Sequence, residues 1–280
     1  FLFSVFFAGY HYVTAGTGVP VDYWHMGFHM SGVIILVFIL YPMIKRGDSR
    51  RLHANTWWRF SNVPIWDWLL ILAGVASSLY IGVTWYEIDF ELLGWRFFLP
   101  EQVLRQGDPA FIDVIFGTVL IAVLLEAVRR TLGIVVPIII LFFTFYAVFG
   151  QYMPLMILKH PGINWAQYIN NMYFPAEGIY GVTLWIVSTV VFHFVLFGVL
   201  AQRMGLGQFF VDIATVIAGR YTGGLAKVSV VSSAFFGTIS GSSIANTVST
   251  GSLTIPNMKR MGYPGHLAGG VEAASSAGGQ

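Results

Sequence analysis

The sequence of 280 residues contains no cysteine and few charged side chains, and both features restrict what the protein can be. Without cysteine the chain cannot form a disulfide, hold a metal through thiolates or use a cysteine nucleophile. Charged residues make up only 10% of the chain, whereas soluble proteins contain about 25%. Hydrophobic residues make up 56%, and the mean hydropathy is +0.71. The composition therefore predicts an integral membrane protein.

Other motifs are also missing. No G-x-x-x-x-G-K-[ST] phosphate-binding loop occurs, so nothing in the chain supports ATP-driven transport. Nothing resembles a hydrolase triad or a cluster of metal ligands. We therefore expect no enzymatic activity, no nucleic-acid partner and no cofactor.

Long apolar windows predict the membrane spans. Those long enough to cross about 30 Å of hydrocarbon are Met26–Ile44, Ile65–Trp85, Ile112–Ala127, Ile134–Gln151 and Gly178–Ala201. Residues Phe1–Tyr10 are predicted to end an earlier, truncated span. The fold class is thus an all-α polytopic membrane protein with about six transmembrane helices.

The distribution of charge orients these spans. Lysine and arginine concentrate in Lys45–Arg59, at Arg129-Arg130 and at Arg203. The positive-inside rule places these positions in the cytoplasm. The loops expected outside are Tyr12–His25, Tyr86–Phe111 and Tyr152–Glu177.

Residues Gln202–Arg220 have apolar side chains at helical spacing. This pattern predicts an amphipathic helix on the cytoplasmic surface. A helix packed on neighbouring spans explains the spacing equally well.

The apolar stretch Leu225–Ile255 has basic residues at both ends, with Arg220 before it, Lys227 at its start and Lys259-Arg260 after it. A single crossing would put the second group outside, against the charge rule. Glycine and asparagine concentrate in its centre, so a re-entrant helical hairpin at about 225–258 is predicted. The alternative is one long helix that packs through Ser233, Gly237 and Gly241.

The hairpin tip is rich in oxygen ligands suited to a hard cation such as Na⁺. Hydroxyls of Ser240, Ser242 and Ser243, free carbonyls and the Asn246 amide can supply them. A half-helix beginning at Ser249 or Thr250 would direct its N-terminal amides at an anionic carboxylate. Glu272 follows in the next apolar segment and is a candidate coupling carboxylate; its alternative is a position near the interface or a pair with Lys259.

Two long motifs here resemble the large membrane subunit of TRAP transporters, tripartite periplasmic carriers that use an extracytoplasmic binding protein. They are F-G-x-I-S-G-S-S at Phe236–Ser243 and I-P-x-M-K-R-x-G-Y at Ile255–Tyr263. Glu177–Gly181 and Val271–Gln280 resemble the TAXI-type branch, in which the small and large membrane subunits are fused. The chain is then expected to be the N-terminal fragment of a fused permease.

The resemblance implies a division into parts. Residues 1–128 would be a small-subunit-like four-helix scaffold, and 129–176 a connecting helix and outer loop. Residues 177–280 would begin the large transport subunit and contain its first hairpin. The protein would be a multi-pass protein of the bacterial inner membrane, in contact with the lipid bilayer.

The resemblance also implies a function. A secondary transporter would import a small organic anion, a carboxylate, with a Na⁺ gradient by an elevator mechanism, fed by a periplasmic substrate-binding protein. The implied cation ligands are Ser240, Gly241, Ser242, Ser243 and Asn246, and the implied substrate ligands are Asn246, Thr247 and Thr250. Na⁺ at the hairpin tip is the only metal expected, as the coupling ion, and a proton is the main alternative.

Two other functions remain open. His25 and His29 are spaced i, i+4 and His193 lies in mid-span, so histidines facing one another could bind haem in a cytochrome subunit. The chain could also be a scaffold within a larger membrane complex. Glu126, one turn before Arg129 and Arg130, is expected to form a local ion pair.

Overall fold

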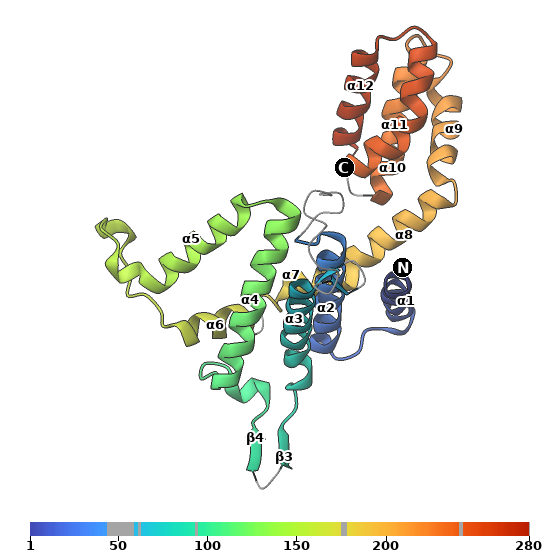
Figure 1. Ribbon diagram of the computed structural model, residues 1–280. Coiled ribbons are helices and arrows are strands. Elements are labelled where there is room, and N and C mark those ends of the chain that lie inside the picture. The colour runs from blue at the N-terminus through green and yellow to red at the C-terminus, as the bar shows by residue number, and fades with distance from the viewer. Residues whose placement is uncertain (44–58, 61–62, 93–94, 175–177, 241–242, 280) are drawn as a thin grey trace. The chain divides into compact units, whose positions relative to one another are not determined.

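The computed structural model describes residues 1–43, 59–60, 63–92, 95–174, 178–240 and 243–279. The chain divides into two compact units, Phe1–Thr189 and Val190–Gln280 (Figure 1). Within the described residues five helical segments are long and apolar enough to cross a membrane: Asp22–Leu40, Ile65–Val83, Phe111–Leu132, Val135–Tyr152 and Val182–Arg203. These segments confirm the all-α polytopic fold class, and they match the five full spans predicted from the sequence.

Unit 1 is built from helices with two short β-ribbons. Its α-helices are α1 (Leu2–Thr17), α2 (Asp22–Leu40), α3 (Ile65–Val83), α4 (Phe111–Leu132), α5 (Val135–Phe149), α6 (Trp165–Tyr173) and α7 (Val182–Ile186). Short 3₁₀ turns are η3 (Gln102–Arg105), η4 (Gly150–Tyr152) and η5 (Met156–Leu158), and η6 (Val187–Val191) is a π-helix. The strands are β1 (Arg59–Phe60), β2 (Val63–Pro64), β3 (Ile88–Leu92) and β4 (Trp95–Leu99), paired β1 with β2 and β3 with β4.

The first outer loop is shorter than predicted. Helix α1 continues to Thr17 and α2 starts at Asp22, so an extended loop over Tyr12–His25 is wrong. Hydrogen bonds join α1 to α2 on either side of this turn. His11 Nε2 and His29 Nδ1 lie 2.9 Å apart in a buried hydrogen bond, and Tyr10 OH lies 3.1 Å from His25 Nδ1.

The core of unit 1 lies where α2, α3, α4 and α6 meet. Its fully buried side chains include Phe38, Ile81, Leu120 and Tyr173. Small residues let the helices approach closely, as in membrane helix pairs. A Cβ on Gly27 would lie only 2.6 Å from the carbonyl oxygen of Ser78, so this contact between α2 and α3 requires glycine.

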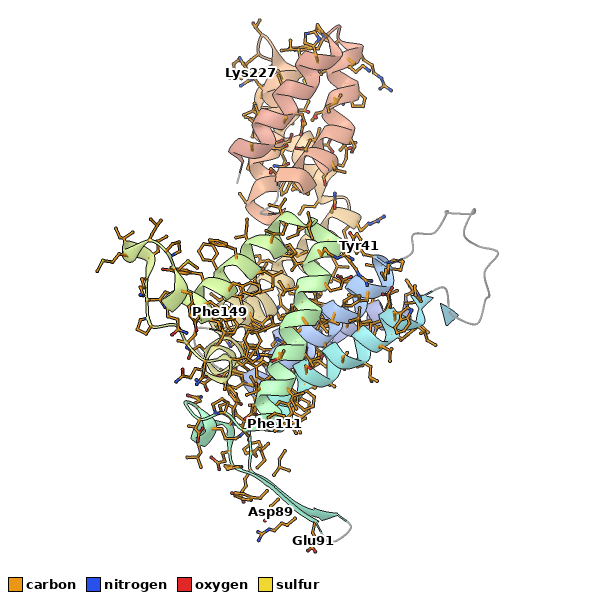
Figure 2. All side chains as sticks on the ribbon, turned by 60° about the vertical axis from the view of Figure 1, so that its left-hand side comes forward. Tyr41, Asp89, Glu91, Phe111, Phe149 and Lys227 are labelled. Atoms are coloured by element: carbon orange, nitrogen blue, oxygen red, sulfur yellow. The ribbon has the colours of Figure 1, made fainter. Side chains whose placement is uncertain are left out.

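The connection between α3 and α4, which is predicted to lie outside, contains a β-ribbon that the sequence pattern did not predict. Strands β3 and β4 are antiparallel, and Glu91 pairs with Arg96 in the register. The ribbon lies beyond the ends of α3 and α4, and Asp89 and Glu91 lie beyond Phe111, where α4 begins (Figure 2). The Arg96 guanidinium hydrogen-bonds Asp89 and holds the pKa of that carboxyl below its usual range.

Unit 2 is entirely helical over its described residues. It contains α8 (Phe192–Arg203), α9 (Leu206–Ala218), α10 (Gly224–Ser240), α11 (Ser243–Arg260) and α12 (Gly265–Gly278). Helix α10 packs against α9, α11 and α12. The buried face of α9 includes Val211, Ala214 and Ala218 and packs on α10 with Val228. Helix α9 is thus amphipathic and packs on α10 through one face, while its position on the cytoplasmic surface stays a prediction.

Helices α10 and α11 form the predicted helical hairpin. They have 17 and 18 residues and pack along each other, so the alternative of one long helix is wrong. The connection, residues 241–242, lies outside the described residues. The re-entrant position of the hairpin in a membrane stays a prediction.

Candidate functional site

A buried carboxylate lies at the centre of the helical bundle in unit 2. Glu272 on α12 is 0% exposed, and hydroxyl groups from three helices surround its side chain. These are Ser229 and Ser233 on α10, Thr250 and Thr254 on α11, and Ser276 on α12. We call these five residues the hydroxyl cage. All of them are buried, so Glu272 is solvated by protein oxygen atoms instead of water.

Both oxygen atoms of the carboxylate accept hydrogen bonds. Oε2 lies 2.6 Å from Ser229 Oγ and 2.5 Å from Thr254 Oγ1. Oε1 accepts from Thr250 Oγ1, and it lies 3.2 Å from Ser233 Oγ and 3.4 Å from Ser276 Oγ. Hydrogen bonds to a carboxylate are stronger than neutral ones. Together they offset part of the cost of burying this group.

Glu272 does not pair with Lys259, which was one alternative for this residue. Lys259 is exposed in the last turn of α11. Among the described residues, the salt bridges join other carboxylates. The alternative of a position near the membrane interface stays a prediction.

Asn246 connects the two arms of the hairpin beside the cage. It is fully buried, and its Nδ2 donates to the backbone carbonyl oxygen of Ser233 at 2.9 Å. This bond orients the amide so that Oδ1 faces Thr250 Oγ1 at 3.2 Å. The asparagine thereby links the hairpin tip to the hydroxyl that contacts Glu272.

The second arm of the hairpin begins earlier than predicted. Helix α11 starts at Ser243, so Ser249 and Thr250 lie inside it and their amides are not free to bind an anion. Gly251 does not break the helix but makes room for Glu272. A Cβ at Gly251 would lie 2.9 Å from Glu272 Cγ. The prediction of a half-helix starting at Ser249 or Thr250 is therefore wrong, and any N-terminal dipole acts near Ser243.

Other predicted ligands are only partly placed. Gly241 and Ser242 lie outside the described residues, as does the side chain of Ser240, whose backbone ends α10. Ser243 and Thr247 are half-buried at the start of α11, where Thr247 Oγ1 donates to the Ser243 carbonyl oxygen at 2.8 Å. The predicted cation and substrate ligands thus remain predictions, except that Asn246 and Thr250 are shown to be close to one another.

Four members of the cage are not among the ligands predicted from the sequence: Ser229, Ser233, Thr254 and Ser276. A signal for them exists. Ser229 and Ser233 are spaced i, i+4, as are Thr250 and Thr254, and as are Glu272 and Ser276. This spacing puts each pair on one face of its helix. Three polar pairs on three consecutive helices indicate a shared buried site.

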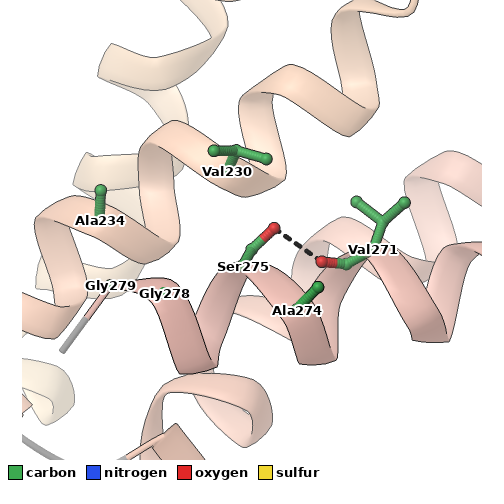
Figure 3. Close-up of a pocket in the computed structure, with 7 residues that line it drawn as sticks. All are labelled: Val230, Ala234, Val271, Ala274, Ser275, Gly278 and Gly279. Carbon is green, nitrogen blue, oxygen red and sulfur yellow. Dashed lines mark hydrogen bonds between the residues drawn. The ribbon is translucent and has the colours of Figure 1, made fainter.

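A surface hollow of about 400 Å³ lies between α10 and α12 (Figure 3). Its walls are mostly apolar and include Val230, Ala234 and Val271. Ser275 Oγ in this lining donates back to the carbonyl oxygen of Val271 at 2.6 Å. The hollow therefore offers little to a charged ligand, and none of the predicted site residues lines it.

The buried histidines His11, His25 and His29 of unit 1 are engaged in hydrogen bonds. His25 Nδ1 lies 3.1 Å from Tyr10 OH and its Nε2 lies 3.2 Å from the Ser188 carbonyl oxygen. The described residues contain no group of three or more histidine, aspartate or glutamate side chains arranged to hold a metal ion. His193 is half-buried on α8.

The ion pair expected at Glu126 is confirmed. Its carboxylate lies 2.7 Å from Arg129 Nε and 2.7 Å from Arg130 Nε. Arg130 also reaches Asp67 on α3 at 2.8 Å. These contacts join α3 to the end of α4 and have a structural role.

Comparison with known proteins gives one family match. Residues 119–280 match the model of a family described as the tripartite ATP-independent periplasmic transporter, DctM component. No solved structure matches the chain.

Curated relatives match a shorter segment. The C4-dicarboxylate TRAP transporter large permease protein DctM of Rhodobacter capsulatus is 34% identical over 84 residues, which is 30% of this chain and 19% of that protein. The sialic acid TRAP transporter permease protein SiaT of Haemophilus influenzae is 34% identical over 82 residues, 29% of this chain and 13% of that protein. The 2,3-diketo-L-gulonate TRAP transporter large permease protein YiaN of Escherichia coli is 33% identical over 81 residues, 29% of this chain and 19% of that protein. The match thus spans less than a fifth of the length of these relatives.

Proposed function

Because this chain belongs to the family of the DctM component of tripartite ATP-independent periplasmic transporters, we propose that it forms part of a permease that imports a small organic anion with a Na⁺ gradient. The permease lies in the bacterial inner membrane as a multi-pass protein. An extracytoplasmic binding protein delivers the substrate to it. Transport uses ion binding coupled to occupancy of the substrate site and involves no covalent chemistry.

The observation that carries this proposal is the polar interior of unit 2. Glu272, Asn246 and the hydroxyl cage are buried within the helical bundle of unit 2. Ionisable and amide groups are costly in such an environment, and in membrane proteins they mark ion and substrate pathways. A purely structural bundle would pack apolar side chains at these positions.

The cation is proposed to bind at the tip of the hairpin. Its ligands there are the oxygens of Ser240, Gly241, Ser242, Ser243 and Asn246. Asn246 supports this role because its Nδ2 donates to the carbonyl oxygen of Ser233. The other end of the amide is then Oδ1, an oxygen atom that can bind a cation. Ser243 supports it because its half-buried hydroxyl lies at the first residue of α11, next to the tip.

The substrate is proposed to be a carboxylate held beside the cation by Asn246 and Thr247. The printed names of three relatives specify a C4-dicarboxylate, sialic acid and 2,3-diketo-L-gulonate, and all three are organic acids. The N-terminus of α11 adds a positive dipole end that favours an anion. Thr250 is assigned an indirect role, since its hydroxyl contacts Glu272.

An elevator mechanism requires the hairpin and its neighbours to move as one body. Glu272 connects α10, α11 and α12, and Gln202 on α8 donates to Ser249 on α11. These contacts support joint movement of the helices. We propose that residues 1–128 form the scaffold in a fused, TAXI-type permease, that 129–176 connect it, and that 177–280 begin the transport part.

The test is uptake by the full-length transporter in proteoliposomes, with its purified binding protein and a labelled carboxylate. Na⁺ and proton gradients are imposed separately. We expect uptake that requires both the binding protein and an inward Na⁺ gradient. An uptake rate that is the same with and without the Na⁺ gradient would contradict the proposal. So would the absence of uptake for every carboxylate tested.

A further inference from the structure

We infer that the carboxyl group of Glu272 is a proton-binding site that takes up and releases one proton during each transport cycle. This inference rests on the proposed transport function and adds a second ion to it. The chemical change is the conversion of a carboxylate to a neutral carboxylic acid, and the proton comes from and returns to water on the two sides of the membrane. Three features of the structure carry the inference.

The first feature is the closeness of the cage to the carboxylate. A hard cation lies about 2.3–2.6 Å from each of its oxygen ligands. Two oxygen atoms that bind the same cation are therefore farther apart than two oxygen atoms joined by a hydrogen bond. Thr254 Oγ1 and Ser229 Oγ lie 2.5 Å and 2.6 Å from Glu272 Oε2. A metal ion could not enter between these atoms without opening the bundle. A proton fits on either hydrogen bond without any displacement.

The second feature is that the threonines of the cage have alternative acceptors. Thr250 Oγ1 can donate to Glu272 Oε1 or to the Asn246 carbonyl oxygen at 2.9 Å. Thr254 Oγ1 can donate to Glu272 Oε2 or to the Thr250 carbonyl oxygen at 3.0 Å. When the carboxyl is protonated it becomes a donor, and either threonine can accept from it after turning its own hydrogen to the backbone.

Both charge states therefore keep their hydrogen bonds satisfied. A buried polar group that loses its partner costs about 1–3 kcal/mol, and this arrangement avoids that cost in either state. Rotation of a hydroxyl is enough to switch between them. This is what a reversible proton site needs, whereas a fixed structural carboxylate needs donors alone.

The third feature is the absence of a resident counter-charge at the site. The titratable side chains on the described parts of the helices around Glu272 are Lys227 on α10, Lys259 and Arg260 on α11, and His266 on α12. All four are exposed, and the Lys227 ammonium lies over the Tyr221 ring. Asp212 on α9 is also exposed and accepts from Gln208. None of these groups forms an ion pair or hydrogen bond with Glu272. No neighbouring charge on the described parts of these helices therefore fixes the protonation state of its carboxyl group.

The coupling to the hairpin runs through Thr250. Its hydroxyl reaches both Glu272 Oε1 and Asn246 Oδ1. Protonation of Glu272 therefore changes which oxygen the threonine donates to, next to the amide that we assign to the cation site. Proton binding and cation binding are linked by one hydroxyl.

The decisive variant is Glu272→Gln, which is permanently neutral and nearly the same shape. Full-length transporter is reconstituted with its binding protein, and the initial uptake rate is measured at a constant Na⁺ gradient with and without an inward proton gradient. We expect the proton gradient to raise the rate of the wild type and to leave the rate of Glu272→Gln unchanged. Substrate exchange at equal ion concentrations should persist in the variant, because exchange needs no net proton movement.

Two further variants guard against a folding defect. Glu272→Asp keeps an ionisable group and should retain the proton response. Gly270→Ala on α12, where a Cβ meets nothing within 4 Å, should behave like the wild type. In purified wild-type protein, infrared difference spectra between acidic and alkaline buffer should show a buried carboxylic C=O band that shifts in Glu272→Asp. A Na⁺-driven wild type without a proton response, or an unchanged response in Glu272→Gln, would overturn this inference alone. A wild type without Na⁺-driven uptake would instead contradict the proposed function.

Discussion

Asn246 donates from its side-chain Nδ2 to the backbone carbonyl oxygen of Ser233 at 2.9 Å, across the two arms of the hairpin. Both residues are fully buried. The bond therefore holds the arms in register immediately beside the carboxylate of Glu272, which Ser233 also contacts. The stability of the hairpin and the geometry of the proposed ion sites depend on the same residue.

Replacing Asn246 by alanine is expected to lower the free energy of unfolding by about 1–3 kcal/mol, because a buried backbone acceptor loses its side-chain donor. Thermal unfolding of the detergent-purified protein measures this effect. Ser252→Ala on the exposed side of α11 is the matched control, since Ser252 Oγ only donates to the carbonyl oxygen of its neighbour Ser249. Equal melting temperatures for the two variants would refute the structural role of Asn246.

Gly251→Ala is expected to damage the Glu272 site through steric overlap. The new Cβ would lie 2.9 Å from Glu272 Cγ and 3.3 Å from Ile255 Cδ1. Overpacking of this kind costs about 1–3 kcal/mol, so both thermal stability and uptake should fall. Gly270→Ala on α12 is the control, because its Cβ meets nothing within 4 Å and alanine favours a helix by about 1 kcal/mol. A Gly251→Ala variant as stable and active as Gly270→Ala would contradict the placement of Glu272.

Arg105→Ala is expected to destabilise unit 1 strongly. Arg105 and Asp113 form a salt bridge with both side chains buried, and Tyr80 OH also donates to Asp113 at 2.6 Å. Removing one partner leaves a buried charge uncompensated, which costs about 3–5 kcal/mol. The exposed pair of Arg96 with Asp89 provides a comparison, and Arg96→Ala should change the melting temperature little.

The double variant Arg105→Ala/Asp113→Ala separates the pair from other losses. It should be less destabilised than the sum of the two single variants, because the double variant leaves no charge unpaired. Additive effects would show that the two residues act independently and would contradict the ion pair.

Purified full-length protein is expected to lack a Soret absorption band. Both ring nitrogens of His25 have hydrogen-bond partners, Tyr10 and the Ser188 carbonyl oxygen. His11 likewise contacts the Phe7 carbonyl oxygen and His29. Coordination of haem iron would require these bonds to break. A Soret band that is lost in His25→Ala would instead favour the cytochrome alternative.

Much of the fold is predictable from the sequence because hydrocarbon imposes a simple length rule. Apolar windows located the spans at Ile65–Trp85 and Ile134–Gln151 to within a few residues of α3 and α5. The hairpin was predicted from the basic residues on its two sides. The β-ribbon at Ile88–Leu99 was not, since its residues lie in a loop whose composition indicates only exposure.

The candidate site is less predictable because its contacts join separate helices. Glu272 is recognisable as an ionisable residue in an apolar segment. The residues next to it in the sequence do not show that Ser229 and Thr254 contact it. The intrinsic preferences of Asn246 and Gly251 predict breaks in the helix. In the structure tertiary contacts override those preferences, because Asn246 bonds to the opposite arm and Gly251 accommodates Glu272.

The most direct test of the proposed transport site is Na⁺-driven uptake by the full-length Ser242→Ala/Asn246→Ala variant, measured beside the wild type and Ser252→Ala. Membrane insertion of each protein is measured in parallel. The proposed site predicts that the double variant inserts normally but loses Na⁺-dependent uptake, while Ser252→Ala retains it. Wild-type rates of Na⁺-dependent uptake in the double variant would show that the hairpin tip does not bind the coupling cation.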